Sequence, residues 1–557
     1  MIKKTLVEYF KESIVKNWDL PALADYKDVG YTYSQLGARI KKIHLLFEKS
    51  GIQKGDKVAL IGKNSAEWAI AFLAVVSYGA VVVPILPDFT SKDVHHIVTH
   101  AEAKLFFVSS HLYPTYNFEE MKTLEGILIL KDNSLADFRK KKVKTAHDSF
   151  ETDFEKLFPE GFKREDLKFE SIDNDELAAI NYTSGTTGFS KGVMLNHKSL
   201  ASNIRFAENN MPLKNGDAIV SFLPLAHAYG MAFEFLFPFS IGCQVIFLTK
   251  TPSPAIVTQA FKEIRPRLIL SVPLIIEKIF KKRIKPQIEK PIVSTFLKIP
   301  ILNKLIHKKV LAGLKEGFGG NFEEVVIGGA ALNEDIEKLF KKIGFPFTIG
   351  YGMTECGPLI AYASWKEMRV GSCGKPVDNM EVIIDSDDPI NEVGEILVKG
   401  DHVMLGYYKN PEATAEAIDK DGWLHTGDLG LIDKDNFIYI KGRSKNMILG
   451  SSGQNIFPEE IESILNNRAY ISESLVIDKK GKLVALIYPD FDHMKLTNVN
   501  ESGLEKIFEK YRKQANENLP AYMRLSKMVY HAEEFVKTPK QSIKRFLYKD
   551  AEVSSVL

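Results

Sequence analysis

Residues 181–192 read Asn-Tyr-Thr-Ser-Gly-Thr-Thr-Gly-Phe-Ser-Lys-Gly and follow a short apolar run that predicts a buried strand. Glycines let backbone N–H groups turn toward an anion, hydroxyl side chains donate to phosphate oxygens, and the lysine adds a positive charge. The stretch therefore suits a polyphosphate, although a polar surface loop can have the same composition. The residues expected to contact a nucleotide are Thr183, Ser184, Gly185, Thr186, Thr187, Gly188 and Lys191.

This loop is not the Walker pattern, because Lys191 is followed by glycine rather than by serine or threonine. Its order, Tyr-Thr-Ser-Gly-Thr-Thr-Gly-x-x-Lys-Gly, closely resembles the phosphate loop of the adenylate-forming enzymes, a superfamily that includes the acyl-CoA synthetases. The resemblance implies an α/β fold. A large domain over residues 1–443, with layered α/β subdomains and a β-rich subdomain, would precede a small mobile α+β domain over residues 444–557.

Composition is typical of a globular protein with more than one domain, since 45% of the 557 residues are hydrophobic and 26% are charged. A net charge of +2 gives no case for nucleic acid as a partner. Cys243, Cys356 and Cys373 are too scattered for a disulfide framework or a metal cluster, which favours a reducing cytosol. The first apolar run breaks at Glu8, so we expect no signal peptide and a cytoplasmic protein.

An uncharged run over residues 68–86 has the length of a membrane span, but helix-capping and turn residues in and before it favour a different structure. Asn64 and Glu67 have the spacing of a capping box, and Gly79 can end a helix. We expect a helix, a glycine turn and a buried strand over residues 80–85, within a parallel sheet that is covered on both faces. Residues 5–18 read as an amphipathic helix.

A single histidine, His227, lies in the nearly uncharged stretch 219–233. It could be a core histidine bonded to a carbonyl, but its Pro-Leu-x-His context resembles a motif whose histidine lies beside the acyl site of the family. Adenylation domains for amino acids place an aspartate here to hold the substrate ammonium, and this stretch has none. The substrate acid is therefore expected to lack an α-amino group. Four phenylalanines follow at every second position, which is not the spacing of a helix: Phe233, Phe235, Phe237 and Phe239. We expect them to lie in the core or to line an acyl channel.

Two further motifs resemble nucleotide-binding segments of the family. Small residues after the strand 325–327 allow a flat ring to approach the backbone, and the order Tyr-Gly-x-Thr-Glu follows some 20 residues later. Each element alone could be a tight turn, a core tyrosine or a surface glutamate. The resemblance assigns Tyr351 to adenine, Thr354 to the α-phosphate and Glu355 to Mg²⁺. The residues expected to bind nucleotide here are Gly328, Gly329, Ala330, Ala331, Tyr351, Gly352 and Thr354.

The chain then becomes β-rich, and Thr426-Gly427-Asp428 matches the ribose-binding motif of the family, although an aspartate at such a turn can be a simple cap. The resemblance places Arg443 on the same ribose, Lys445 at the hinge between the domains, and Gly453 in a loop near the pantetheine tunnel.

Residues 281–309 carry nine basic side chains against one acidic side chain, with aliphatic residues between them. A solvated basic surface over normal packing is one interpretation. The other is peripheral contact with anionic lipid on the inner face of a membrane, where each basic residue contributes about 1 kcal/mol.

One departure concerns the last family motif, commonly Lys-Thr-x-x-Gly-Lys-x-x-Arg, whose second lysine contacts the acyl carboxylate and the α-phosphate. This chain reads Lys-Thr-Pro-Lys-Gln-Ser-Ile-Lys-Arg over residues 537–545, so Ser542 occupies the lysine position. Lys540 and Lys544 flank it. Along an extended segment all three share a face, and we favour Lys540 as the replacement.

The sequence therefore predicts an ATP-dependent, Mg²⁺-activated acyl-CoA synthetase that acts on a medium- or long-chain fatty acid with CoA as acceptor. One alternative is a ligase that delivers acyl-AMP to a carrier protein. Another is a nucleotide- or acyl-binding protein with impaired adenylation, which Ser542 motivates. The residues expected to be catalytic are Lys191, His227, Thr354, Glu355 and Lys540.

Overall fold

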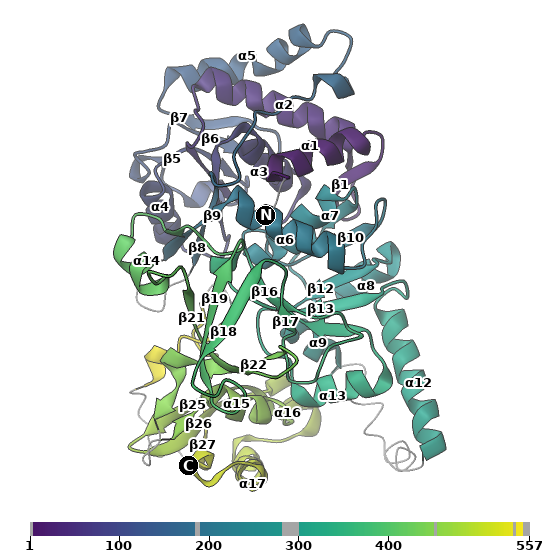
Figure 1. Ribbon diagram of the computed structural model, residues 1–557, viewed down its shortest axis with the longest axis vertical. Coiled ribbons are helices and arrows are strands. Elements are labelled where there is room, and N and C mark those ends of the chain that lie inside the picture. The colour runs from purple at the N-terminus through teal and green to yellow at the C-terminus, as the bar shows by residue number, and fades with distance from the viewer. Residues whose placement is uncertain (1–3, 184–189, 281–299, 450–453, 539–541, 550–557) are drawn as a thin grey trace. The chain divides into compact units, whose positions relative to one another are not determined.

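The computed structural model divides the chain into two compact units, and both mix helices with strands (Figure 1). This confirms the predicted α/β class, whereas the domain boundary predicted between residues 443 and 444 stays a prediction. The described residues are 4–183, 190–280, 300–449, 454–538 and 542–549. Among the described residues, the first unit comprises 4–183, 190–280, 300–381 and 398–424, and the second comprises 382–397, 425–449, 454–538 and 542–549.

The largest sheet of the first unit has eight strands in the order β20-β9-β8-β4-β3-β5-β6-β7. Its central strands β8, β4, β3, β5 and β6 are parallel to one another, as the continuous apolar runs predict. The bounds are β3 (Lys57–Ile61), β4 (Val81–Ile85), β5 (Ala103–Val108), β6 (Gly126–Ile129), β7 (Leu135–Phe138), β8 (Leu177–Thr183), β9 (Lys191–Asn196) and β20 (Gly406–Tyr407).

The uncharged run after residue 66 forms helix α3 (Ala66–Tyr78), then Gly79 with a left-handed backbone, then β4, as predicted. The predicted cap is wrong by one residue, because Ser65 accepts the N–H of Trp68. Asn64 instead bonds to the backbone of a distant loop, at Leu223 and Leu225. Among the described residues, no helix combines the length and apolar character that crossing a membrane requires.

The other helices of the first unit begin with α1 (Leu6–Lys16), which confirms the predicted amphipathic helix and is capped by Thr5. Helices α2 (Tyr33–Ser50) and α5 (Lys141–Leu157) pack side by side (Figure 1). The remaining helices are α4 (Ser91–His100), α6 (His197–Asn210), α7 (Phe237–Ser240), α8 (Pro254–Ile264), α9 (Pro273–Ile279), α12 (Pro300–Gly317), α13 (Glu334–Ile343) and α14 (Pro411–Ala417).

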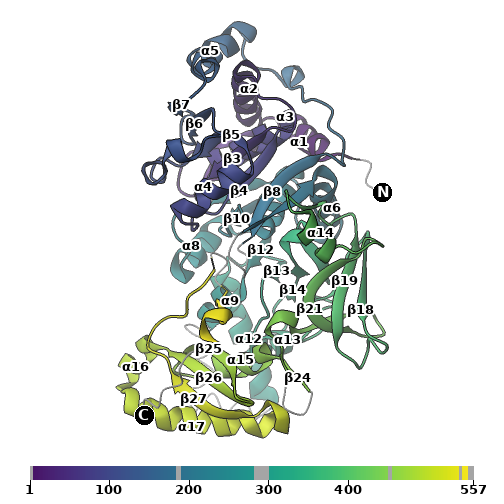
Figure 2. The ribbon, with the colours of Figure 1, turned by 90° about the vertical axis from the view of Figure 1, so that its left-hand side faces the viewer.

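Three smaller sheets complete the first unit, and one of them is the parallel sheet β12-β13-β14 (Figure 2). The other two have the orders β10-β11-β1-β2 and β15-β16-β17. Their strands are β1 (Pro21–Asp25), β2 (Tyr31–Thr32), β10 (Ala218–Ser221), β11 (Gln244–Phe247), β12 (Leu268–Ser271), β13 (Glu324–Ile327), β14 (Phe347–Ile349), β15 (Tyr351–Gly352), β16 (Leu359–Tyr362) and β17 (Lys375–Pro376).

The phenylalanine-rich segment differs from its predicted period. Residues Gly230–Leu236 form a π-helix that continues into α7, although the phenylalanines alternate along the sequence. Every residue of the π-helix and of α7 is buried, so Phe233, Phe235, Phe237 and Phe239 all lie in the core whatever their spacing.

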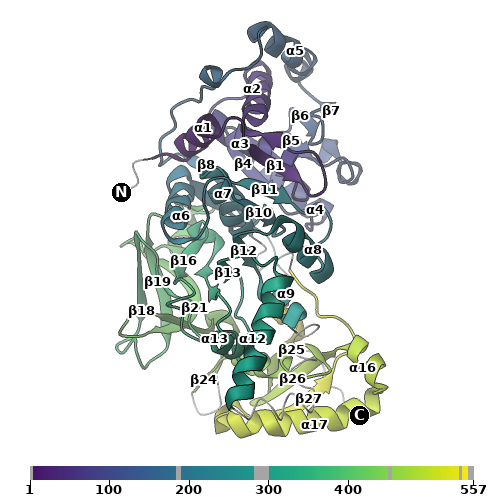
Figure 3. The ribbon, with the colours of Figure 1, turned by 90° about the vertical axis from the view of Figure 1, so that its right-hand side faces the viewer.

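The second unit contains the antiparallel pair β25 and β26, with β27 parallel to β26. Helix α17 lies along this three-stranded sheet (Figure 3), and together they enclose an apolar core. Strands β18, β19, β21 and β22 form a sheet whose residues lie mostly in this unit. The bounds are β18 (Met380–Asp385), β19 (Gly394–Gly400), β21 (Leu424–Ile432), β22 (Ile438–Arg443), β23 (Ile448–Leu449), β24 (Asn455–Ile456), α15 (Pro458–Asn466), β25 (Ile471–Lys479), β26 (Lys482–Pro489), α16 (Phe491–Thr497), α17 (Glu501–Asn518) and β27 (Leu525–Tyr530).

Candidate active site

The carboxyl ends of β12, β13 and β14 meet at one edge of their sheet. Ser271, Ile327 and Ile349 are register partners in adjacent strands. Just beyond them, the N–H of Gly328 donates to the Ser271 carbonyl at 3.1 Å, and the N–H of Gly350 donates to the Ile327 carbonyl at 2.9 Å. Ligands of open α/β sheets bind outside such strand ends. The structure therefore brings the two predicted nucleotide segments, which start at these glycines, to one edge.

The glycine-rich segment after β13 lies against Tyr229. The Tyr229 hydroxyl donates to the Val326 carbonyl at 3.1 Å, and a Cβ on Gly328 would lie 3.1 Å from the Tyr229 ring. Gly328 itself is buried, whereas Gly329, Ala330 and Ala331 are exposed. The small residues at this strand end thus permit a close approach by an aromatic side chain of the protein, with exposed backbone beyond it.

His227 is half-buried in a loop that three buried polar side chains hold. The Asn181 side chain, on β8, donates to the Ala226 carbonyl at 3.1 Å. Asn64 donates to the carbonyl of Leu223 at 2.7 Å. The loop with His227 is therefore bonded to the strand that leads into the predicted phosphate loop.

Glu234 is the third of these side chains, and it is fully buried on the π-helix. One carboxyl oxygen accepts the N–H groups of Phe222 and Leu223, both at 2.8 Å. Burial raises the pKa of Glu234 well above its ordinary value. This carboxyl group therefore holds the backbone of the loop, and its burial favours the protonated form.

Strands β8 and β9 form an antiparallel hairpin that carries the two ends of the predicted phosphate loop. Thr183 and Lys191 are register partners, and the Thr183 hydroxyl donates to the Lys191 carbonyl at 3.4 Å. Ser184, Gly185, Thr186, Thr187 and Gly188 lie outside the described residues, so their predicted contacts stay predictions.

The segment after β14 carries Tyr351, which is buried, and then Thr354 and Glu355, which are half-buried in a 3-10 helix, Thr354–Cys356. A Cβ on Gly352 would lie 2.2 Å from the Pro358 carbonyl oxygen, so this turn requires glycine. Glu355 is held by Tyr407, whose hydroxyl donates to the Glu355 carboxylate at 3.1 Å. Sequence reasoning did not identify Tyr407 as a site residue.

Tyr407 also contacts the phosphate-loop lysine, since the Lys191 ammonium lies 4.6 Å from the centre of the Tyr407 ring. Burial, followed by the nearby Glu355 carboxylate, holds the pKa of Tyr407 above its usual range, so its hydroxyl remains a donor. The structure thereby brings together Lys191 and Glu355, two residues that the sequence predicts to be catalytic.

These side chains fit a triphosphate with a divalent cation. Within the described part of the chain, no cluster of three or more histidine, cysteine, aspartate or glutamate side chains could hold a metal by itself. Mg²⁺ is commonly held by one or two carboxylates together with substrate phosphates. Glu355 offers one carboxylate, and it shares Tyr407 as a contact with the Lys191 ammonium. Glu355 would hold the cation only together with the nucleotide.

The predicted ribose residues lie together in the second unit. Asp428 on β21 and Arg443 on β22 are register partners. Asp428 is only 5% exposed. Arg443 and Lys445 are exposed, and Lys445 lies in a short 3-10 helix, Ser444–Asn446. Gly453 lies outside the described residues, so its predicted role stays a prediction.

Ser542 closes a loop near the end of the described chain. The Thr538 N–H donates to the Ser542 carbonyl at 2.8 Å, and Lys537 and Ile543 form an antiparallel bridge. Ser542 is exposed. Residues 537–538 and 542–543 are therefore paired with each other, whereas Lys540 lies outside the described residues.

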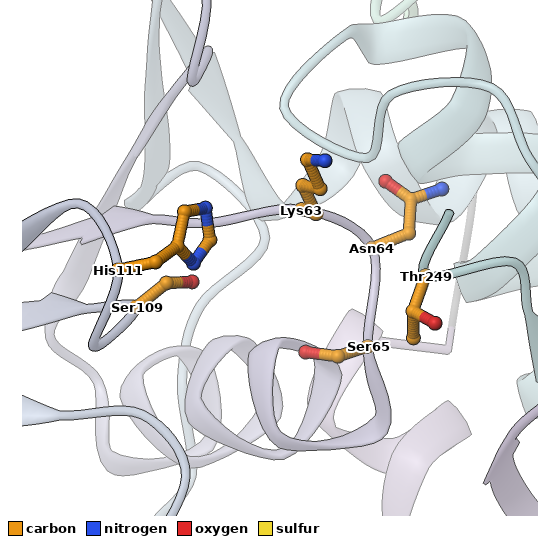
Figure 4. A pocket seen from close by; sticks show the side chains of 6 residues that line it. All are labelled: Lys63, Asn64, Ser65, Ser109, His111 and Thr249. Carbon is orange, nitrogen blue, oxygen red and sulfur yellow. The ribbon is translucent and has the colours of Figure 1, made fainter. Parts of the chain in front are cut away.

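A separate pocket of about 350 Å³ lies at the carboxyl ends of β3 and β5 (Figure 4). Its lining is polar, and Ser65 brings the start of α3 to its wall. None of its lining residues is a predicted site residue. They are Lys63, Asn64, Ser65, Ser109, His111 and Thr249.

Solved structures share this fold at low sequence identity. The anthranilate CoA ligase AuaEII, solved with anthranoyl-AMP, aligns with a TM-score of 0.79 and 20% identity over 98% of this chain and 97% of its own. The o-succinylbenzoate CoA synthetase MenE from Bacillus subtilis aligns with a TM-score of 0.74 and 22% identity over 98% of both chains. The fold is therefore that of these ligases.

Proteins of similar sequence are also CoA ligases. The chain is 29% identical over 495 residues to a long-chain-fatty-acid–CoA ligase of Salmonella typhimurium, with 84% of this chain and 82% of that protein covered. It is 28% identical over 516 residues to the long-chain-fatty-acid–CoA ligase ACSBG2 of Gallus gallus, with 87% and 67% covered. The model of the AMP-binding enzyme family matches residues 10–408. The chain therefore belongs to the family of AMP-binding enzymes.

Proposed function

We propose that this protein is an acid–CoA ligase that activates a medium- or long-chain fatty acid in two steps. ATP and the acid give acyl-AMP and pyrophosphate, and CoA then gives acyl-CoA and AMP. The observation that carries the proposal is the contact of both Lys191 and Glu355 with Tyr407. The Lys191 cation at the start of β9 and a carboxylate suited to a metal thus contact one side chain, which supports a role in adenylation.

In the first step an oxygen of the substrate carboxylate attacks the α-phosphorus of ATP. The bond from that phosphorus to the bridging oxygen breaks, and pyrophosphate leaves. The chain's part is to hold the charges in place, with Lys191 and Thr354 directed at the phosphates and His227 at the acyl end. Bound Mg²⁺, held through Glu355, would supply further positive charge to the phosphates.

In the second step the CoA sulfur attacks the acyl carbonyl carbon, the bond from carbon to the phosphate oxygen breaks, and AMP leaves. Asp428 and Arg443 would retain the nucleotide through its ribose, because a carboxylate can accept from two adjacent hydroxyls. By the family resemblance, movement about Lys445 would admit the thiol between the two steps. Exclusion of water would protect the adenylate.

The environment of His227 supports an acid without an α-amino group. Glu234 is the carboxyl group that follows this stretch most closely in sequence, and it is fully buried with its bonds made to backbone N–H groups. A fully buried carboxyl group that is bonded to backbone N–H groups is not available to a substrate ammonium. The four buried phenylalanines that follow add apolar surface on the same segment.

Two alternatives remain as outcomes of the test. A ligase that serves a carrier protein would release pyrophosphate without using free CoA, and a binding protein would release none. The experiment incubates the protein with ATP, Mg²⁺, CoA and a panel of straight-chain fatty acids, aromatic acids and amino acids. We expect thioester products, detected by mass spectrometry, with straight-chain acids above the others. A preference for aromatic acids would overturn the fatty-acid assignment.

A further inference from the structure

Tyr407 lies on β20, at the edge of the large sheet, where β20 pairs with the strand that begins at Lys191. Tyr407 is the register partner of Val193, and the neighbouring Tyr408 N–H donates to the Gly192 carbonyl at 2.8 Å. Backbone pairing therefore fixes Tyr407 beside the hairpin that carries the phosphate loop.

Helix α14 fixes the same residue from the other direction. The Tyr407 N–H donates to the Thr414 hydroxyl at 2.9 Å. Gly406 has a φ of 132°, and a Cβ there would lie 2.6 Å from the Thr414 methyl group. The close approach of Thr414 thus depends on glycine before Tyr407, and it leaves the Tyr407 backbone little freedom.

The side chain of Tyr407 uses its two ends differently. Its ring faces the Lys191 ammonium at 4.6 Å, and its hydroxyl bonds to the Glu355 carboxylate at 3.1 Å. No ion pair between described residues includes Lys191 or Glu355. A neutral side chain therefore orients both charged groups, and Lys191 and Glu355 do not form an ion pair with each other.

We propose that Tyr407 is a positioning residue for adenylation, which holds Lys191 through its ring and Glu355 through its hydroxyl so that both charges stay available to the phosphates and the cation. The inference rests on the proposed function, because it concerns the same site. Groups that orient a metal-binding carboxylate commonly change metal affinity when they are removed. The two contacts can be separated by mutation, since phenylalanine keeps the ring and loses the hydroxyl.

The test compares Tyr407→Phe and Tyr407→Leu with the wild type by two binding measurements. One is Mn²⁺ affinity, by electron paramagnetic resonance, in the presence of α,β-methylene-ATP, which cannot be cleaved between its α and β phosphorus atoms. The other is the affinity for this analogue at saturating Mn²⁺. Tyr407→Phe should weaken Mn²⁺ binding by about 10-fold and leave analogue affinity nearly unchanged. Tyr407→Leu should in addition weaken analogue binding by roughly 5-fold, because the contact with Lys191 is lost.

Tyr408→Phe is the matched control. Tyr408 is the next residue, and its hydroxyl bonds to Glu102 at 3.3 Å instead of to Glu355. The control should change neither affinity. The inference is wrong if Tyr407→Phe binds Mn²⁺ as tightly as the wild type, if Tyr408→Phe has the same effect, or if the wild type shows no nucleotide-dependent Mn²⁺ binding.

The binding arms also separate this inference from the proposed function. If the wild type activates no acid but Tyr407→Phe still weakens Mn²⁺ binding, the positioning role stands and the ligase assignment fails. If Tyr407→Leu does not fold, Tyr407→Phe decides by itself. If Tyr407→Phe has the ligase activity of the wild type at limiting Mg²⁺, the proposed function stands and the positioning role of Tyr407 is wrong.

Discussion

The Arg443 guanidinium lies against the Asp428 carboxylate, with Nε and Oδ1 2.8 Å apart, across the antiparallel pair β21 and β22. Asp428 is 5% exposed, whereas Arg443 is exposed. The ion pair holds the buried carboxylate of Asp428 in a fixed orientation. The ribose contact predicted for both residues therefore concerns an ion pair that lies within the second unit.

Asp428→Asn should weaken AMP binding, because the amide replaces one acceptor oxygen with a donor and has no charge to strengthen bonds from the ribose hydroxyls. It also leaves Arg443 without its carboxylate partner. Hydrogen bonds to charged groups contribute about 1.5–3 kcal/mol, so the dissociation constant for AMP should rise by roughly 10-fold or more. Titration calorimetry of the full chain with AMP measures it. Asp387→Asn, at an exposed position in the same unit, is the control and should bind AMP as the wild type does. Equal affinities in all three proteins would remove Asp428 from the site.

Lys540→Ala should lower acyl-AMP formation strongly and leave thioester formation from supplied acyl-AMP nearly intact. The substrate carboxylate must approach a negatively charged triphosphate, and two unit charges at 4 Å repel by about 4 kcal/mol at an effective dielectric constant of 20. Ser542 cannot offset this. Adding Ser542→Lys to that variant should restore part of the rate, because it returns a cation to the family's position.

Lys544→Ala is the comparison for this prediction, since Lys544 flanks Ser542 on the other side. Single-turnover formation of acyl-AMP separates the variants. If both Lys540→Ala and Lys544→Ala adenylate at the wild-type rate, neither lysine replaces the missing cation, and Lys191 with the metal must suffice.

The stability of the protein should depend on pH through Glu337 of α13. Burial raises the pKa of Glu337 to about 7 from 4.5, although its carboxylate accepts the Gly371 N–H at 2.8 Å. Between these pH values the folded state keeps a proton that the unfolded state has lost, so the free energy of unfolding falls as pH rises. The contribution of Glu337 to the free energy of unfolding is complete below pH 4.5 and is reduced by up to about 3 kcal/mol above pH 7.

Glu337→Gln removes this titration and can still accept the Gly371 N–H through its side-chain carbonyl. Denaturant unfolding at a series of pH values should show that the free energy of unfolding of the variant rises relative to that of the wild type from pH 4.5 to pH 7. A difference between the two proteins that stays constant over this range would contradict the assignment.

Helix α12 is the described part of the basic stretch predicted to contact anionic lipid. Leu305 is 60% exposed there, next to the exposed Lys304, Lys308 and Lys309. Binding to anionic vesicles should weaken with salt, since surface attraction is screened within about 8–10 Å at physiological ionic strength. Changing these three lysines to glutamate should further reduce the fraction of the protein that sediments with the vesicles.

The matched control changes Lys140, Lys141 and Lys144 to glutamate, because all three are exposed on or beside α5. This control should sediment with vesicles as the wild type does. If the wild type ignores anionic vesicles even at low salt, the basic stretch is a solvated surface.

Local signals in the sequence predicted the elements that local chemistry decides. Gly79 ends α3 because only a residue tolerant of its left-handed backbone fits there, and the β-branched run beyond it becomes β4. The π-helix at 230–236 escaped prediction, since its period depends on how the core packs rather than on a repeat in the chain.

Tyr407 shows what a single sequence does not contain. Its partners lie at positions 191 and 355, and only the pairing of β20 with β9 brings the three residues together. Gly406 was the available local signal, because a glycine within a short strand often marks a close backbone approach. That signal does not name the partners, and so the link between the two predicted catalytic residues came from the structure.

The central claim is that this chain joins a carboxylic acid to AMP, and exchange of labelled pyrophosphate into ATP measures that step without CoA. With a straight-chain fatty acid the wild type should exchange pyrophosphate, and at limiting Mg²⁺ Glu355→Gln should do so about 100-fold more slowly, because it keeps the side-chain shape and loses the charge. Acid-dependent exchange that Glu355→Gln lacks would support the account. No exchange by the wild type with any acid of the panel, or equal exchange by the two proteins at limiting Mg²⁺, would contradict it.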